Sequence, residues 1–313
     1  MISVQVIKTA RELESLGPEW SALWDRCPSA TPFQTPEWLL PWWESFGAGQ
    51  LAVLAFRAGG KLAGLAPFWI EGGVLRLLGA GISDYLDVLV EPEWRGGAAE
   101  LLWEHLLLLP WQRCEFTDLR SGSLLLESLP RRLNAWVEPW ALCPALPLPL
   151  GDHRGIRRNV RRYSRHFGPL ENASPGTLDE YLDALFRLHS ARWGLRGAPG
   201  VLADPLVQVF HRRAAAGLVA SGRLLLCGVR REGSLAALIY GFQGHQRIWT
   251  YLSGFDPTAA RFSPGAVALG LVFEQAARAG CLEADFLRGG EAYKYAWGAF
   301  DRPTFRLEAG LRQ

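Results

Sequence analysis

Residues 285–298 gather acidic, basic and phenolic side chains directly after an apolar segment. The segment contains two carboxylates, two phenols and two cations: Asp285, Glu291, Tyr293, Tyr295, Arg288 and Lys294. Carboxylates can accept protons, a phenol can donate one, and guanidinium and ammonium groups can bind anions. Glycines between these residues let the backbone approach a ligand closely. The segment therefore predicts the lining of a site, and the alternative is a solvated strand end followed by an ordinary amphipathic helix.

The composition is that of a folded protein without an extreme charge. The chain has 313 residues, of which 49% are hydrophobic, and it includes 14 tryptophans. Such a chain can fill a packed core, and its length favours two domains over one. The formal net charge of +2 does not by itself demand a nucleic-acid or membrane partner.

The five cysteines are spread along the chain, and none forms a Cys-x-x-Cys pair. This spacing argues against a disulfide framework and against a zinc site, so no metal is expected. No run reaches the ~18 apolar residues that a membrane-spanning helix needs, and no export signal is recognised. We therefore expect a soluble, cytoplasmic protein with no membrane span.

One pattern of strands and helices occurs twice. The first copy has strand-like runs at 51–56, 62–70, 84–90 and 114–122, with a helix at 91–109 before the last; the second has runs at 223–230, 235–242, 247–253 and 282–290, with a helix at 264–279 before the last. Helical periodicity precedes each copy, at 10–27 and 36–46 and at 178–194 and 205–220. The first two runs of each copy flank a turn, which is typical of a β-hairpin. The copies lie roughly 170 residues apart and predict two α/β units.

A proline-rich segment, 138–150, lies between the two copies. Proline disfavours a helix there and indicates an extended crossover. We therefore predict an N-terminal domain at 1–145 and a C-terminal domain at 146–313.

The order of elements resembles the GNAT N-acetyltransferase fold, and two such units in one chain resemble the Fem aminoacyl transferases. Four segments are similar to the BioF2-like acetyltransferase group, which includes CelD-labelled proteins associated with cellulose or exopolysaccharide synthesis: 32–39, 84–87, 253–257 and 285–297. The resemblance covers nearly the whole chain. It implies an α/β (α+β) fold of two tandem GNAT-like units, each a mixed, largely antiparallel sheet flanked by helices. It also implies an acyl-CoA-dependent N- or O-acyltransferase, expected to be an acetyltransferase, whose acceptor is a small molecule, a sugar or a polysaccharide precursor.

The resemblance implies a donor site where the second long helix begins. Its residues would be Arg261, Ser263, Gly265 and Ala266. Ser263 is expected at the N-cap and Pro264 at the first helical position, and free amide groups there, with Arg261, could hold the pyrophosphate of acetyl-CoA or another acyl-CoA. The loop departs from the usual Gly-x-Gly/Ala signature because it has one glycine. A helix that is merely well capped is the alternative.

Acyl transfer needs a proton acceptor, a stabilised oxyanion and a donor to the leaving group. Asp285 or Glu291 could be the base, and Tyr293 could protonate the leaving thiolate. Arg288 and Lys294 could hold an anionic acceptor or the donor phosphates.

The first copy offers a weaker set of candidates. Asp84, Tyr85 and Asp87 would lie near a strand end and could orient an acceptor in a cleft between the domains. A capped turn is the alternative reading of these three residues. The segment 94–98 could also receive an anion, but it ranks second as a donor site.

The segment 153–166 is a local excess of positive charge. Ile156, Val160 and Tyr163 recur at helical spacing, which predicts a solvated helix with one apolar face. The arginines between them could instead bind tRNA, as a Fem-like aminoacyl-tRNA-dependent transferase would require. A third possibility is a non-catalytic partner in exopolysaccharide or cellulose assembly.

Other enzyme classes lack their residues in this sequence. There is no His-Glu-x-x-His, no Gly-x-Ser-x-Gly and no Walker loop. Gly79-Ala80-Gly81 fails the dinucleotide-binding pattern because Asp84 stands where its third glycine belongs.

Overall fold

A computed structural model describes residues 2–151, 154–194 and 197–310. The chain divides into two compact units. Unit 1 comprises Met1–Ala141 and the segment that returns from Pro303, and unit 2 comprises Leu142–Arg302. The border lies close to residue 145, where the domain boundary is predicted. The returning C-terminal strand is the difference, since the predicted division assigns it to the second domain.

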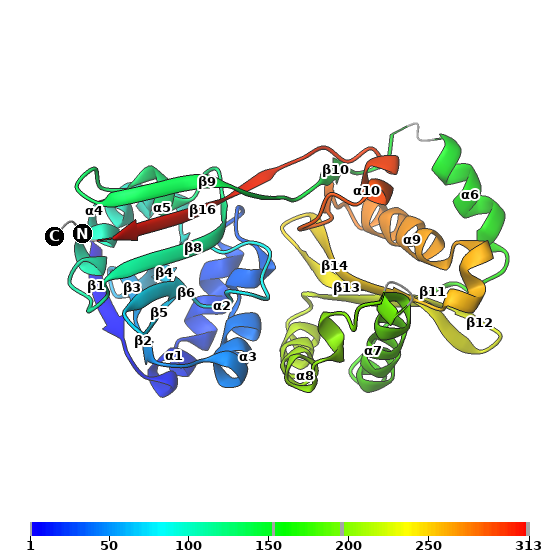
Figure 1. Ribbon diagram of the computed structural model, residues 1–313, viewed down its shortest axis with the longest axis horizontal. Coiled ribbons are helices and arrows are strands. Elements are labelled where there is room, and N and C mark those ends of the chain that lie inside the picture. The colour runs from blue at the N-terminus through cyan, green and yellow to red at the C-terminus, as the bar shows by residue number, and fades with distance from the viewer. Residues whose placement is uncertain (1, 152–153, 195–196, 311–313) are drawn as a thin grey trace. The chain divides into compact units, whose positions relative to one another are not determined.

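Unit 2 is a six-stranded mixed sheet with helices on both faces (Figure 1). Its strands are β10 (Ala145–Pro147), β11 (Leu170–Asn172), β12 (Leu224–Arg231), β13 (Ser234–Gly244), β14 (Arg247–Phe255) and β15 (Glu283–Asp285), in the order β10-β15-β14-β13-β12-β11. Its helices are α6 (Arg154–Ser164), α7 (Leu178–Gly194), η3 (Val201–Ala203), α8 (Pro205–Ala220), η4 (Pro257–Phe262), α9 (Pro264–Arg278) and α10 (Ala292–Ala296). β14 and β15 run parallel, and the other neighbouring strands are antiparallel.

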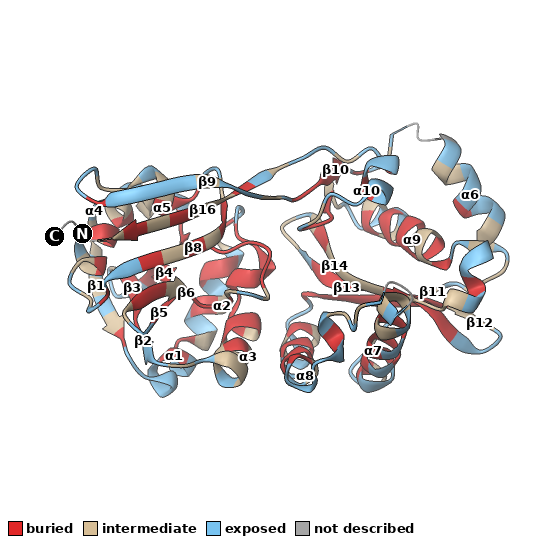
Figure 2. Ribbon diagram, viewed as in Figure 1, coloured by how far each residue is buried: buried red, intermediate tan, exposed pale blue. Residues whose placement is uncertain are grey.

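The two faces of this sheet carry different helices. In Figure 1, α7 and α8 cover one face, and α6 and α9 cover the other. α9 packs against the sheet with one face in the core, where Val267, Val272 and Phe273 are buried. Figure 2 shows α9 largely buried and α6 largely exposed.

The pairing of β14 with β15 is short. It covers Arg247–Trp249 against Glu283–Asp285, and β14 then continues to Phe255 without this partner. Tyr251 is an extra residue in β14, since Tyr240 of β13 pairs with Leu252 and Gly241 with Thr250. Such a β-bulge bends its strand and is common beside functional sites. The sheet is therefore open on one side of β14 beyond Trp249.

Unit 1 has two sheets. Its strands are β1 (Ile2–Ile7), β2 (Gln50–Leu51), β3 (Val53–Ala58), β4 (Lys61–Ala66), β5 (Phe68–Glu71), β6 (Val74–Leu77), β7 (Leu89–Val90), β8 (Arg113–Arg120), β9 (Asn134–Leu142) and β16 (Pro303–Gly310), in the orders β1-β3-β4-β7 and β2-β5-β6-β8-β16-β9. Its helices are α1 (Ala10–Ser15), α2 (Gly17–Asp25), η1 (Pro32–Gln34), α3 (Pro36–Phe46), η2 (Pro92–Trp94), α4 (Arg95–Leu106) and α5 (Leu124–Glu127). β6 and β8 are parallel with α4 between them in sequence, as β14 and β15 are with α9. The predicted fold of two tandem units, each a largely antiparallel mixed sheet flanked by helices, is confirmed.

The predicted strand at 84–90 is wrong over most of its length. Only Leu89–Val90 of it is a strand, and the strands that follow the β3–β4 hairpin are β5 and β6. Pro67 has no N–H to donate and separates β4 from β5, which then turns back into β6. The side chain of Asp87 accepts a hydrogen bond from the N–H of Val88 at 2.8 Å. This N–H is therefore not available for pairing with a neighbouring strand.

The helices agree closely with the periodicity in the sequence. α7 and α8 have the predicted bounds, whereas the predicted helix 10–27 is interrupted at Leu16, before Pro18. Within the described parts of the chain, no helix is both long and apolar enough to cross a membrane.

Candidate functional site

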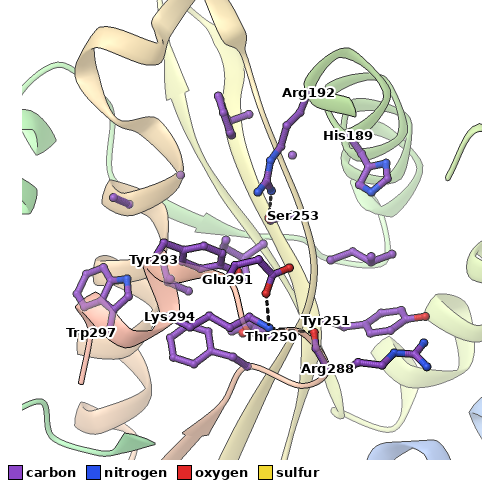
Figure 3. A pocket seen from close by; sticks show the side chains of 18 of the residues that line it. His189, Arg192, Thr250, Tyr251, Ser253, Arg288, Glu291, Tyr293, Lys294 and Trp297 are labelled. Atoms are coloured by element: carbon purple, nitrogen blue, oxygen red, sulfur yellow. Dashed lines mark hydrogen bonds and ion pairs between the residues drawn. The ribbon is translucent and has the colours of Figure 1, made fainter. Parts of the chain in front are cut away.

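A cavity of about 330 Å³ lies in unit 2 where β14 loses its partner β15 (Figure 3). Its walls include residues of α7, β14, α9 and the segment after β15: His189, Arg192 and Trp193; Thr250–Phe255; Gly265, Ala266 and Leu269; Phe286, Arg288, Glu291, Tyr293, Lys294 and Trp297. α7 and α9 cover opposite faces of the sheet. Because both helices line one space, the cavity passes through the sheet at the opening beside β14.

The N-terminus of α9 forms one wall of this cavity. Gly265 and Ala266 belong to its first turn, where backbone N–H groups have no partner within the helix. A Cβ added to Gly265 would meet nothing closer than the Phe255 ring at 3.6 Å, so there is room beside the backbone. Free amides and the positive end of the helix dipole make this wall suited to an anion.

Two of the four predicted donor residues, Ser263 and Arg261, do not make the contacts that were predicted for them. Ser263 occupies the N-cap position, but it has a left-handed conformation (φ 50°) and its side chain makes no capping hydrogen bond. Arg261 is not among the cavity-lining residues, and its guanidinium lies over the Phe262 ring at 4.7 Å. The predicted helix start is therefore correct, but its side-chain cap is not.

Lys294 anchors the segment that follows β15. Its side chain is 3% exposed, and Nζ donates to the carbonyl oxygens of Leu287, Arg288 and Gly289 at 3.2, 2.9 and 2.8 Å. Nζ also lies 2.9 Å from Oε2 of Glu291, as Figure 3 shows. These contacts saturate the ammonium group, so Lys294 positions the loop and Glu291. This role differs from the predicted contact with a ligand.

Asp285 has a structural position next to the cavity rather than in its wall. Its side chain is buried, and Oδ1 accepts the N–H of Leu287 at 2.7 Å. Leu287 has a φ of 57°, which is unusual for a residue with a Cβ. The carboxylate therefore stabilises a strained turn. Of the two predicted bases, Glu291 is the one that lines the cavity.

Glu291 and Tyr293 have pKa values that are shifted in opposite directions. Burial raises the pKa of Glu291, but the ion pair with Lys294 outweighs it, and the net pKa is below the usual value. Tyr293 is 41% exposed, but desolvation of its ring at the cavity wall, with the nearby Glu291 carboxylate, raises its pKa to about 12. A Cβ on Gly289 would lie 2.6 Å from Oε2 of Glu291, so glycine is needed for this carboxylate to fold back. Near neutral pH the pair offers an ionised carboxylate and a protonated phenol.

The opposite wall contains residues that the sequence analysis missed. Arg192 of α7 donates to Oγ of Ser253 at 3.0 Å and lies over the Phe255 ring at 5.5 Å. His189 is 2% exposed, and burial, with the nearby Arg192 charge, lowers its pKa to about 4. A Cβ on Gly254 would lie 2.7 Å from the backbone nitrogen of His189, so this glycine lets α7 approach β14. The similarity of segment 253–257 to the acetyltransferase group was the available signal.

Two buried imidazoles predict that unit 2 loses stability in acid. Burial lowers the pKa of His189 to about 4 and that of His211 to about 3, from 6.5. Since the folded values lie below the unfolded value, the contribution to stability is complete above pH 6.5 and is lost as pH falls towards 4. Each imidazole should reduce the free energy of unfolding by up to about 1.4 kcal/mol per pH unit in that window.

Urea unfolding at pH 7, 6, 5 and 4 checks this expectation. His211→Phe keeps an aromatic ring beside Tyr240 but cannot titrate, so its stability should fall less steeply with acid. A slope equal to that of the unaltered protein would contradict the prediction.

The predicted acceptor residues of the first copy lie in unit 1 and are buried. Oδ1 of Asp87 accepts from Oγ of Ser123 at 2.7 Å, and burial raises the pKa of this carboxyl to about 6. The guanidinium of Arg120 lies 5.7 Å from the Tyr85 ring centroid. Asp84 is 6% exposed. These contacts support the capped-turn alternative, and an acceptor role for the three residues stays a prediction.

The basic segment forms α6, as its periodicity predicts, although His153 lies outside the described residues. Val160 is 6% exposed and packs in the core of unit 2, and Ile156 lines the cavity. The exposed side of the helix carries Arg158, Arg161 and Arg162, and the exposed Arg165 follows directly after its end.

Residues 152–295 match the family described as "Acetyltransferase (GNAT) domain". No curated protein sequence matches the chain. Similar solved structures include FemX (11% identity, 97% of this chain and 96% of that one, TM-score 0.64). They also include a C-terminal domain (DUF2156) assigned to lysylphosphatidylglycerol synthetase from Agrobacterium fabrum (11%, 97% and 93%, TM-score 0.63). A third is a tandem GNAT protein from the clavulanic acid biosynthesis pathway (18%, 98% and 98%, TM-score 0.51).

At these identities the structural likeness establishes the fold alone. The sequence match covers nearly all of unit 2, which contains the cavity. The chain is thus built of two tandem units of the GNAT fold, and the second of them carries the match to the acetyltransferase domain of the GNAT superfamily.

Proposed function

We propose that this protein is an acyl-CoA-dependent acyltransferase whose reaction takes place in the cavity of unit 2, with acetyl-CoA as the first donor to test. One observation carries the proposal. The cavity passes through the sheet beside the free N-terminus of α9, and an ionised carboxylate and a protonated phenol stand in its wall.

The donor side of the proposal rests on α9 and β14. The pyrophosphate of the donor would accept hydrogen bonds from the first-turn amides at Gly265 and Ala266. Its extended arm carries amide groups, and β14 beyond Trp249 has lost the strand partner on this side. An amide chain can therefore pair with this edge as an added strand would. The thioester would then lie inside the cavity.

The chemistry assigned to the wall is direct attack on the thioester carbonyl. Glu291, directly or through a water molecule, accepts the proton of the attacking amine or hydroxyl, and the new bond to the carbonyl carbon forms. The carbon–sulfur bond then breaks, and Tyr293 gives its proton to the leaving thiolate. Lys294 holds Glu291 in place throughout and takes no part in proton transfer.

The acceptor would approach from the side of α7. Trp193 and Tyr251 provide aromatic surface there, and Arg192 and Arg288 provide positive charge. Such a wall suits a polar acceptor that carries a negative group, such as an amino acid or an acidic sugar. A small molecule, a sugar or a polysaccharide precursor, as the sequence predicts, remains the class of acceptor.

Replacing Gly265 with valine should abolish CoA binding. The new side chain would project beside the first-turn amides, where the proposal places the pyrophosphate, while the helix itself tolerates valine. Acetyl-CoA and CoA should raise the melting temperature of the unaltered protein but not of Gly265→Val. Gly265→Ala is the matched control, since its single methyl group would have ordinary contact with Phe255 at 3.6 Å, and it should keep part of the shift. Equal affinity in Gly265→Val would refute this donor site.

A second candidate is a transferase that takes its acyl group from aminoacyl-tRNA. The exposed arginines on and just after α6 favour it, because they form one basic surface on a helix whose other side contributes Ile156 to the cavity. Binding of tRNA that weakens steeply with salt, without any stabilisation by CoA, would support this candidate over the first.

A further inference from the structure

Three basic side chains meet around one aromatic ring just before α9 begins, and a fourth lies against one of them. The guanidinium carbon of Arg231 lies 4.5 Å from the Phe262 ring centroid, and that of Arg261 lies 4.7 Å from it. The imidazole of His166 lies 4.4 Å from the same ring, centroid to centroid. Nε of Arg165 is 3.5 Å from Nε2 of His166. We refer to Arg165, His166, Arg231 and Arg261 around Phe262 as the basic rim.

The rim is assembled from three separate stretches of chain. His166 follows α6, Arg231 ends β12, and Phe262 ends η4. β13 starts beside the end of β14, since Ala237 pairs with Phe255, and this pairing brings the β12–β13 turn to η4. Figure 1 shows the end of α6, η4 and β12 gathered at one edge of unit 2. The fold thus concentrates charge that the sequence keeps far apart.

The arginine charges of the rim have little compensation within the protein. Arg231 is paired with Glu232, whose side chain is 80% exposed. In the described part of the chain, neither Arg261 nor His166 takes part in an ion pair. Contact with the Phe262 ring orients the guanidinium groups but does not remove their mutual repulsion. An anion bound between the guanidinium groups would offset this repulsion. Arginine is suited to phosphate, which it binds with two parallel hydrogen bonds.

We propose that the basic rim binds the 3′-phosphate on the ribose of coenzyme A. This inference rests on the proposed function, in which the first turn of α9 takes the pyrophosphate. Phe262 stands three residues before Gly265, so the rim lies beside the same helix start. A donor whose pyrophosphate lies on Gly265 and Ala266 would carry its nucleotide out of the cavity and past the rim. The rim would make the protein selective for coenzyme A over carriers that have the same arm but lack this phosphate.

The test is a comparison of CoA with 3′-dephospho-CoA by isothermal titration calorimetry. The unaltered protein should bind CoA about tenfold tighter or more, as expected for charge-assisted hydrogen bonds to a phosphate. In the double variant Arg231→Gln/Arg261→Gln, this ratio should fall to about one, while the affinity for 3′-dephospho-CoA should change by less than about twofold. The ratio in the unaltered protein should also shrink as salt is added.

Arg278→Gln is the matched control, because Arg278 ends the same helix and has a 78% exposed side chain. It removes one positive charge and should leave the ratio unchanged. A ratio near one in the unaltered protein, or a ratio retained in the double variant, would overturn the inference and leave the donor site standing. If neither ligand binds the unaltered protein, the inference and the proposed donor fall together.

Discussion

Replacing Lys294 with methionine should lower the free energy of unfolding of unit 2 by about 2–4 kcal/mol. Methionine is similar in length but cannot donate, so the carbonyl oxygens of residues 287–289 would lose their common donor in a site where Lys294 is 3% exposed. Glu291 would lose its partner as well, but it is half exposed and water can compensate part of that loss. Urea unfolding followed by circular dichroism measures the change.

Tyr295→Phe is the matched control for this substitution. Tyr295 lies next to Lys294 on α10 and donates a hydrogen bond to Asp301 at 2.7 Å, but on an exposed surface. Its loss should cost no more than about 1 kcal/mol. If Lys294→Met were as stable as Tyr295→Phe, Lys294 would not be the anchor of this loop.

The role of Lys294 also shows where prediction from the sequence stops. Residue types at 285–294 predict the lining of a site, and Arg288, Glu291, Tyr293 and Lys294 line the cavity. Nothing in the spacing tells whether an ammonium group faces a ligand or folds back onto backbone carbonyls. That choice depends on the turn at Leu287, whose left-handed conformation presents three successive carbonyl oxygens to one side chain.

The fold could be predicted from the sequence more fully than the site, because the fold depends on patterns that repeat along the chain. Helical periodicity gave the bounds of α7 and α8, and the repeated hairpins indicated two units. The return of β16 to pair with β8 could not be read from local pattern, since either unit could accept an alternating strand. Likewise, His189 and Arg192 lie on a helix whose sequence gives no sign that Gly254 lets it approach β14 and reach the cavity.

Replacing Glu291 with glutamine should reduce kcat by roughly 10²–10⁴-fold, the usual effect of losing a general base. The amide has nearly the same shape, and its oxygen can still accept a hydrogen bond from Lys294, so the loop should remain in place. CoA binding should therefore be unchanged. Glu274→Gln is the matched control, since Glu274 is an exposed carboxylate on α9 that pairs with Arg278 and does not line the cavity.

The pH profile separates this chemical role from a structural one. Because the pKa of Glu291 is lowered, its carboxylate is ionised throughout the range above about pH 5, and protonation of Glu291 should produce no loss of kcat/KM there. Any acidic limb above that pH belongs to another group, such as the ammonium form of an amine acceptor, and should persist in Glu291→Gln at a uniformly lower rate. Tyr293, with a pKa of about 12, should remain a proton donor up to about pH 11, so no alkaline limb should appear below it. A Glu291→Gln variant with full activity would remove Glu291 as the base and direct attention to the α7 wall, where the neutral imidazole of His189 lines the cavity.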